Sequence, residues 1–187
     1  GGTPTLKKAI IAKFKRDNGL DYPPKQVLVS CGGKHTSFNL CLALLNPGDE
    51  VVVLEPCYDS YVPAITLSGG TPVFVPLRFP DYTIDWEAVR AAVTPRTRMI
   101  MLNSPHNPTG AVFAASDLDA LADVLDGSAA LVLSDEVYEH IVFEGRPHAS
   151  LLTRPELAAR SFVVSSFGKT FHCTGWKVGY CVAPPAL

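Results

Sequence analysis

A chain of 187 residues with 47% hydrophobic and 18% charged residues has the composition of an ordinary globular protein. Its formal net charge of −2 argues against a nucleic-acid partner, because binding to a phosphate backbone normally requires a basic face. The apolar runs at residues 51–54 and 129–133 have the length of strands and are far too short to span a membrane. The sequence therefore predicts a folded domain with neither a nucleic-acid nor a membrane partner.

The five cysteines show no paired spacing of the kind that binds metal, and the five histidines form no metal-binding motif. We interpret the cysteines as core residues or free thiols in a reducing compartment, which favours a cytoplasmic location and no metal site. They are Cys31, Cys41, Cys57, Cys173 and Cys181.

Strand-like and helix-like segments alternate along the chain, which predicts an α/β fold with a mostly parallel sheet and helices on both faces. In chain order we expect a helix through residues 6–14, a strand at 26–29, a helix from Gly33 to Leu45, a strand at 50–54, a helix at 58–67 that contains Pro63, and a strand at 71–75. A helix capped by Asp85, a strand at 98–102, a helix capped by Ser116, and strands at 130–134, 162–165 and 176–182 follow. We expect residues 145–155 to form a surface loop or short connection, and the whole chain to form one domain.

Four polar or glycine-rich positions directly follow predicted strands. They are the pair Gly32 and Gly33, then Asn107, Asp135 and Ser166. Ligands of parallel sheets bind beyond the carboxyl ends of the strands. We therefore expect these residues to gather at one edge of the sheet, although they are scattered in the sequence.

The turn at Gly32, Gly33 and Lys34 has the character of a phosphate site. Glycine lets the backbone approach a ligand closely, and the N-terminus of a helix offers free N–H groups and a positive dipole end. A pair of glycines can equally be a plain turn, and Lys34 can equally be a solvated lysine at the start of a helix.

Asp135 follows a run of apolar residues, where a carboxylate is costly unless it is paired. It is either a cap for the next segment or the partner of a protonated pyridine nitrogen. Asn107 and Tyr138 are either a turn residue and an ordinary half-buried tyrosine, or two ligands of one phenolic oxygen.

Lys169 lies between two apolar strand-like segments, a setting that weakens its interpretation as a surface lysine. Burial and nearby positive charge would depress its pKa, as Schiff-base chemistry requires. Tyr58 is either a ring that stacks on a cofactor or a core residue. Lys177 is either a phosphate ligand or a charge on an edge strand. Together these residues supply each group that a pyridoxal phosphate (PLP) enzyme needs.

The sequence resembles the class I and II aminotransferases of fold type I, and specifically their methionine and kynurenine–oxoglutarate transaminase branch. The matching segments are residues 45–51 (LNPGDEV), 58–61 (YDSY), 103–110 (NSPHNPTG), 134–138 (SDEVY) and 166–180 (SFGKTFHCTGWKVGY). Two positions depart from the family pattern: Lys177 stands where many relatives have arginine, and Gly168 replaces a common serine.

The resemblance implies pyridoxal 5'-phosphate as the cofactor and assigns a role to each matching residue. Lys169 would be the Schiff-base lysine and proton shuttle, Asp135 the partner of the ring nitrogen, and Tyr58 the residue stacked on the ring. Asn107 and Tyr138 would bind the phenolic oxygen. The phosphate cradle would consist of Gly33, Lys34, Ser166 and Lys177.

The resemblance also implies transfer of an amino group from a methionine-like, aromatic or kynurenine-like L-amino acid to a 2-oxo acid. Family members are about twice as long as this chain, so residues 1–187 are expected to be the large cofactor domain of a homodimeric parent. The N-terminal arm, the small domain and the arginine that binds the substrate carboxylate would lie outside it, and the isolated chain would be inactive. Two alternatives stay open: a carbon–sulfur β-lyase acting on cysteine conjugates, and a non-catalytic PLP-binding regulatory domain.

Overall fold

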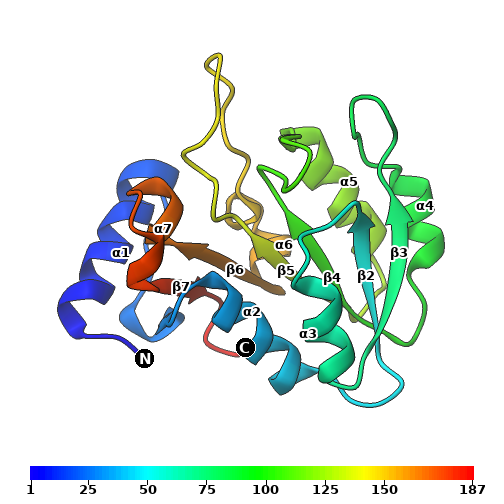
Figure 1. The fold of residues 1–187 in the computed structure, drawn as a ribbon, viewed down its shortest axis with the longest axis horizontal. Helices are drawn as coiled ribbons and strands as arrows, with labels where there is room; N and C mark the ends of the chain where they lie inside the picture. The colour runs from blue at the N-terminus through cyan, green and yellow to red at the C-terminus, as the bar shows by residue number, and fades with distance from the viewer.

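One seven-stranded sheet forms the centre of the computed structural model, which describes all 187 residues (Figure 1). The strands are β1 (Val27–Ser30), β2 (Glu50–Glu55), β3 (Thr71–Pro76), β4 (Thr97–Asn103), β5 (Leu131–Asp135), β6 (Ser161–Ser166) and β7 (Gly179–Val182). Their spatial order is β1-β7-β6-β5-β4-β2-β3, and only β7 runs antiparallel to its neighbours. The predicted mostly parallel α/β fold is therefore confirmed.

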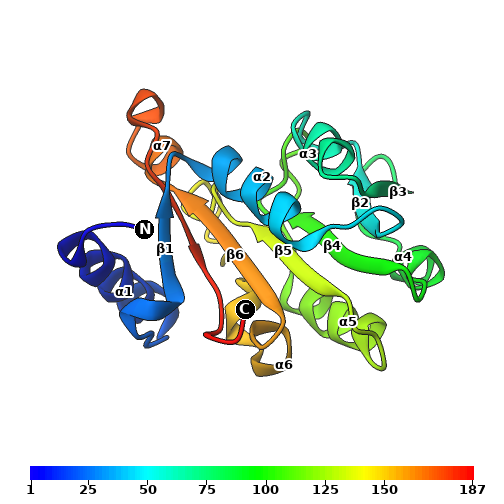
Figure 2. The same ribbon diagram turned by 90° about the horizontal axis from the view of Figure 1, so that it is seen from below.

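Helices cover both faces of the sheet, as Figure 2 shows. They are α1 (Pro4–Asn18), α2 (Gly33–Leu44), α3 (Tyr61–Leu67), α4 (Trp86–Ala92), α5 (Ala115–Leu125), α6 (Pro155–Ala158) and α7 (Phe167–Thr170), with short 3-10 turns η1 (Pro24–Gln26), η2 (Leu151–Thr153) and η3 (Thr174–Trp176). Helices α2 and α3 lie on one face, and α1, α4, α5 and α6 lie on the other. None of these helices combines the length and the apolar character that crossing a bilayer requires.

The side chains of the central strands divide between two cores, one on each face. Val51 and Val53 of β2 pack in the core beneath α2 and α3, whereas Val52 and Leu54 pack in the larger core on the opposite face. Successive side chains of a strand point to opposite faces, so a strand buried on both sides must be apolar at every position. This explains why β2 reads as a continuous apolar run rather than an alternating one.

Two helix starts differ from the sequence-based expectation. Helix α3 begins at Tyr61 rather than Tyr58, so Pro63 lies in the first turn, where a missing N–H costs no helical hydrogen bond. Ser116 does not cap α5, because the helix already begins at Ala115. The carboxylate of Asp117 instead accepts a hydrogen bond from the Ala114 N–H at 2.8 Å.

The last strand is shorter than expected and lies inside the sheet. Residues 174–176 form a 3-10 turn, and Lys177 has a left-handed backbone with φ of 53°, so the strand begins only at Gly179. Because β7 lies between β1 and β6, the interpretation of Lys177 as an edge-strand charge is wrong.

The expected loop at residues 145–155 is only partly at the surface, since Leu151 and Leu152 are buried.

Burial predicts very different costs for the same substitution at two leucines. Leu121 of α5 is fully buried, whereas Leu67 at the end of α3 is 74% exposed. Leu121→Ala should lower the free energy of unfolding by about 2–5 kcal/mol, because it leaves a cavity in the larger core. Leu67→Ala should change it by less than about 0.5 kcal/mol. Urea denaturation of both variants checks this, and equal losses would contradict the assignment of the core.

Candidate active site

The ends of the parallel strands and the start of β7 meet at one edge of the sheet and enclose a cavity of about 240 Å³. All nine residues proposed from the sequence line this cavity, and each comes from a segment next to a strand end. They are Gly33, Lys34, Tyr58, Asn107, Asp135, Tyr138, Ser166, Lys169 and Lys177. The expected convergence at one edge is therefore found, while the role of each residue stays a prediction.

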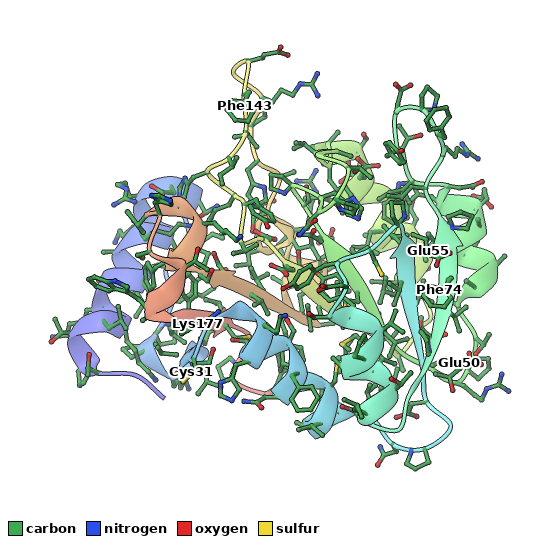
Figure 3. The ribbon with its side chains drawn as sticks, in the orientation of Figure 1. Cys31, Glu50, Glu55, Phe74, Phe143 and Lys177 are labelled. Carbon is green, nitrogen blue, oxygen red and sulfur yellow. The ribbon has the colours of Figure 1, made fainter.

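One end of the cavity is formed by the N-terminus of α2. Gly32 precedes the helix with φ of 89° and supplies no capping side chain, so the first N–H groups of α2 have no acceptor within the helix. Lys34, Ser166 and Lys177 line the same cavity, and Lys177 lies beside the start of α2 in Figure 3. Free N–H groups, a positive dipole end and two lysines together suit a phosphate group.

Gly179 allows β7 to pack directly against this turn. A Cβ atom at position 179 would lie 2.5 Å from the carbonyl carbon of Gly32 and 2.6 Å from the nitrogen of Gly33. Real Cβ atoms essentially never come so close to backbone, so any other residue would push the turn away from the strand. Gly179 is not among the site residues predicted from the sequence, although a glycine that opens a strand often marks a close backbone approach.

Asp135 also lines the cavity and is only 9% exposed. The Tyr61 hydroxyl donates a hydrogen bond to its Oδ2 atom at 2.9 Å, and the Val137 N–H donates to Oδ1 at 3.2 Å. Burial raises the pKa of Asp135 to about 6; these two hydrogen bonds oppose the rise, and the charge of Glu136 adds to it. The carboxylate thus has hydrogen bonds but forms no ion pair with any lysine, arginine or histidine.

Two further acids in the same segment are buried, but each has a cationic partner. Glu136 accepts a hydrogen bond from Nε2 of His148 at 2.8 Å, and Glu139 pairs with Lys13 of α1. Of the three buried acids at positions 135–139, only the one that lines the cavity lacks a partner of opposite charge. A buried charge is stable only when it is paired, so the cavity is suited to a ligand with a cationic group near Asp135.

Asn107 and Tyr138 approach each other on one side of the cavity. The Asn107 side-chain amide lies 3.5 Å from the Tyr138 hydroxyl, so both can reach one acceptor atom between them. Asn103 holds Asn107 in place, because its Oδ1 accepts the Asn107 N–H at 2.7 Å while its Nδ2 donates to the Asp135 carbonyl at 2.9 Å.

Tyr58 and Lys169 complete the lining. The Tyr58 ring meets the Tyr61 ring edge-on with centroids 5.5 Å apart, and Nζ of Lys34 lies 5.3 Å from the Tyr58 centroid. Lys169 follows β6 in the short helix α7, with its Nζ 5.7 Å from the Tyr138 centroid. The expected burial of Lys169 is not found in this chain, where the side chain is exposed and forms no salt bridge.

Sequence reasoning missed Tyr61 and Asn103 as well as Gly179. Tyr61 lies in the matching segment 58–61, but its contact with Asp135 spans 74 positions of the sequence. Asn103 could have been predicted from its position. It ends β4 as Asp135 ends β5, and the two residues are register partners in adjacent strands.

Comparison with known proteins gives one consistent result. The family described as "Aminotransferase class I and II" matches residues 1–187. The chain is 45% identical to the methionine aminotransferase of Escherichia coli and 42% identical to the aspartate/prephenate aminotransferase of Nitrosomonas europaea; both matches cover 100% of the chain and 48% of the relative. A solved aspartate aminotransferase structure from Thermus thermophilus superimposes with a TM-score of 0.93 at 40% identity, covering 99% of this chain and 48% of that one. The chain thus spans about half the length of the relatives it matches.

Because Asp135 has no cationic partner, we expect its ionisation to lower the free energy of unfolding of the ligand-free protein. Because the folded-state pKa of about 6 exceeds the ordinary value of 3.8, the contribution of Asp135 to stability is full below about pH 4 and is lost as the pH rises through 6. Asp135→Asn removes this cost. The stability of the variant relative to wild type should therefore rise by up to about 3 kcal/mol between acidic and neutral pH.

Urea denaturation of the ligand-free proteins across this pH range measures the difference. Asp81→Asn is a matched control, because Asp81 is exposed. A pH-independent difference for Asp135→Asn would show that the ionised carboxylate is not destabilised by burial.

Proposed function

Because the chain belongs to the class I and II aminotransferase family, we propose that its parent protein transfers an amino group from an L-amino acid to a 2-oxo acid with the help of PLP. Members of this family depend on PLP. The observation that carries the proposal is Asp135, a buried carboxylate without a cation that lines the same cavity as Lys169 and a phosphate-binding turn. PLP carries a phosphate, a ring nitrogen and an aldehyde, and so has a group for each of the three.

The residues around the cavity fit PLP from end to end. The α2 N-terminus with Gly33, Lys34, Ser166 and Lys177 would hold the phosphate, and Asp135 would face the ring nitrogen. Asn107 and Tyr138 would donate to the phenolic oxygen, and Tyr58 would pack on the ring. Bound PLP supplies one property, the withdrawal of electrons from the substrate α-carbon.

Lys169 has two tasks in this proposal. Its Nζ would hold the cofactor, and as a free amine it would be the base that moves the proton at the substrate α-carbon. Its lack of a salt bridge fits both tasks, because an amine locked in an ion pair would be a poor nucleophile and base.

Asp135 determines the charge of the ring. An ionised carboxylate in a water-poor setting stabilises a proton on the facing nitrogen, since the two opposite charges compensate each other there. The Tyr61 hydroxyl and the Val137 N–H favour the ionised form and fix its orientation.

The same proposal covers the organisation of the parent protein. We propose that residues 1–187 are its large cofactor domain, and that an N-terminal arm, a small domain and a homodimer partner complete the site in the cytoplasm. The coverage of only 48% of the relatives supports this. The arginine that binds the substrate carboxylate would lie in the small domain, so the isolated chain is expected to be inactive.

Methionine, aromatic amino acids and kynurenine are the proposed amino donors. The methionine aminotransferase relative supports the first, although an aspartate/prephenate aminotransferase is nearly as similar. The names of these relatives favour amino transfer over the β-lyase and the regulatory alternatives.

Lys169→Ala should abolish both covalent PLP attachment and amino transfer in the full-length parent. The first measurement is borohydride reduction of the PLP-loaded protein followed by peptide mapping, and the second is 2-oxo acid formation from each proposed donor. Lys8→Ala is the matched control, because Lys8 is exposed on α1, away from the cavity. Full transamination by the Lys169→Ala variant would refute the assignment, and pyruvate release without amino transfer would favour the β-lyase.

A further inference from the structure

Glu136 is the most deeply buried charged residue of the segment that carries Asp135 and Tyr138, with 2% of its surface exposed. It does not line the cavity. Its Oε1 atom accepts hydrogen bonds from the Ser134 hydroxyl and the Leu151 N–H, both at 3.1 Å, and its Oε2 atom accepts one from His148. Its side chain thus joins the end of β5 to η2 and to the root of the projecting loop that bears Phe143 (Figure 3).

The backbone of Glu136 is held as firmly as its side chain. Its N–H donates to the Val164 carbonyl of β6 at 2.8 Å, and its carbonyl accepts the Glu139 N–H at 3.0 Å. Every hydrogen-bonding group of the residue is therefore satisfied within the protein. A burial this complete leaves one orientation for Glu136 and for the peptide units on either side of it.

Those two peptide units are the ones that orient the Asp135 carboxylate. On one side, the Asp135 carbonyl accepts hydrogen bonds from the Asn103 side chain and the Ser104 N–H, at 2.9 and 3.1 Å. On the other side, the Val137 N–H donates directly to Asp135 Oδ1. A shift of Glu136 would move both contacts together and would carry Tyr138 with them.

The charge of Glu136 requires His148 as a partner. Burial lowers the pKa of His148, but the hydrogen bond and charge of Glu136, helped by the charge of Glu139, outweigh this and raise it overall; Lys13 opposes the rise. His148 Nε2 therefore donates to the Glu136 carboxylate from a buried position. Without His148, Glu136 would be a second uncompensated charge directly next to Asp135.

We propose that Glu136, held by His148, is a positioning residue that fixes the Asp135 carboxylate toward the cavity. The inference rests on the proposed function, in which Asp135 faces the ring nitrogen of PLP. It goes beyond that function, because neither Glu136 nor His148 lines the cavity. A misplacement of Asp135 by about 1 Å would weaken its ion pair with the ring nitrogen and slow the reaction by up to about 100-fold.

The test compares three variants of the full-length, PLP-loaded parent. Glu136→Ala removes all three side-chain hydrogen bonds, whereas Glu136→Gln keeps the acceptor for Ser134 and Leu151 and removes the charge together with the acceptor for His148. Val89→Ala is the control for lost stability, because Val89 is fully buried in α4 and lies outside the cavity. The dissociation constant of PLP, from its visible absorbance, and the thermal midpoint of the cofactor-free protein are measured for each, together with kcat and KM.

Glu136→Ala should weaken PLP binding by about 10- to 100-fold, the range seen when a residue that orients a metal ligand is removed. It should lower kcat more than it raises KM, and Glu136→Gln, which keeps two of the three hydrogen bonds, should lose clearly less PLP affinity than Glu136→Ala. Val89→Ala should lower the thermal midpoint and leave PLP affinity unchanged. This pattern separates positioning from a general loss of stability, which would affect Glu136→Ala and Val89→Ala alike.

His148→Ala provides the same test if Glu136→Ala does not fold, with PLP binding weakened by at least about threefold. Unchanged PLP affinity in the folded alanine variants overturns the proposal, and so does a Glu136→Gln variant as weak as Glu136→Ala. Failure of the wild-type parent to bind PLP would instead refute the proposed function itself.

Discussion

The charge of Asp135 is the constraint on which the candidate site depends. The residue lies at the end of a central strand, where it is buried by both neighbouring strands and by α3, and yet it pairs with no cation. A hydroxyl and an N–H hold it without neutralising it. The ionised carboxylate therefore destabilises the folded protein, and a ligand with a cationic group would remove this destabilisation. Such an arrangement is typical of a functional site.

The parallel topology explains how a site made of distant residues could be predicted at all. Each strand end is visible in the sequence as an apolar run followed within a few residues by a glycine or polar residue. Residues 27–29 precede Gly32 in this way, and residues 162–164 precede Ser166. Once the strands are parallel, those ends must lie on one edge. The nine proposed residues consequently meet around one cavity, although no pair of strands had been assigned.

What escaped prediction depends on contacts that a sequence does not display. Tyr61 reaches Asp135 only because α3 packs over the centre of the sheet, and Gly179 matters only because β7 passes beneath the Gly32 turn. Lys177 was placed on a strand because the apolar pattern continues through Trp176, whereas its left-handed backbone ends that pattern early. The exposure of Lys169 likewise follows from what packs on α7, which local patterns do not encode.

The cavity lining contains both positive and negative groups, and the charges that lack a partner affect the stability of the folded protein. The α2 N-terminus and two lysines bring positive charge to the lining, while the buried Asp135 carboxylate has no cationic partner. A ligand that carries both an anionic group and a protonated nitrogen would compensate the positive groups and the Asp135 carboxylate together. Its binding would therefore stabilise the folded state, by an amount that grows with the logarithm of the ligand concentration over its dissociation constant. The same argument makes the Glu136–His148 pair necessary, because a second unpaired carboxylate beside Asp135 would compete for the ligand's single cationic group.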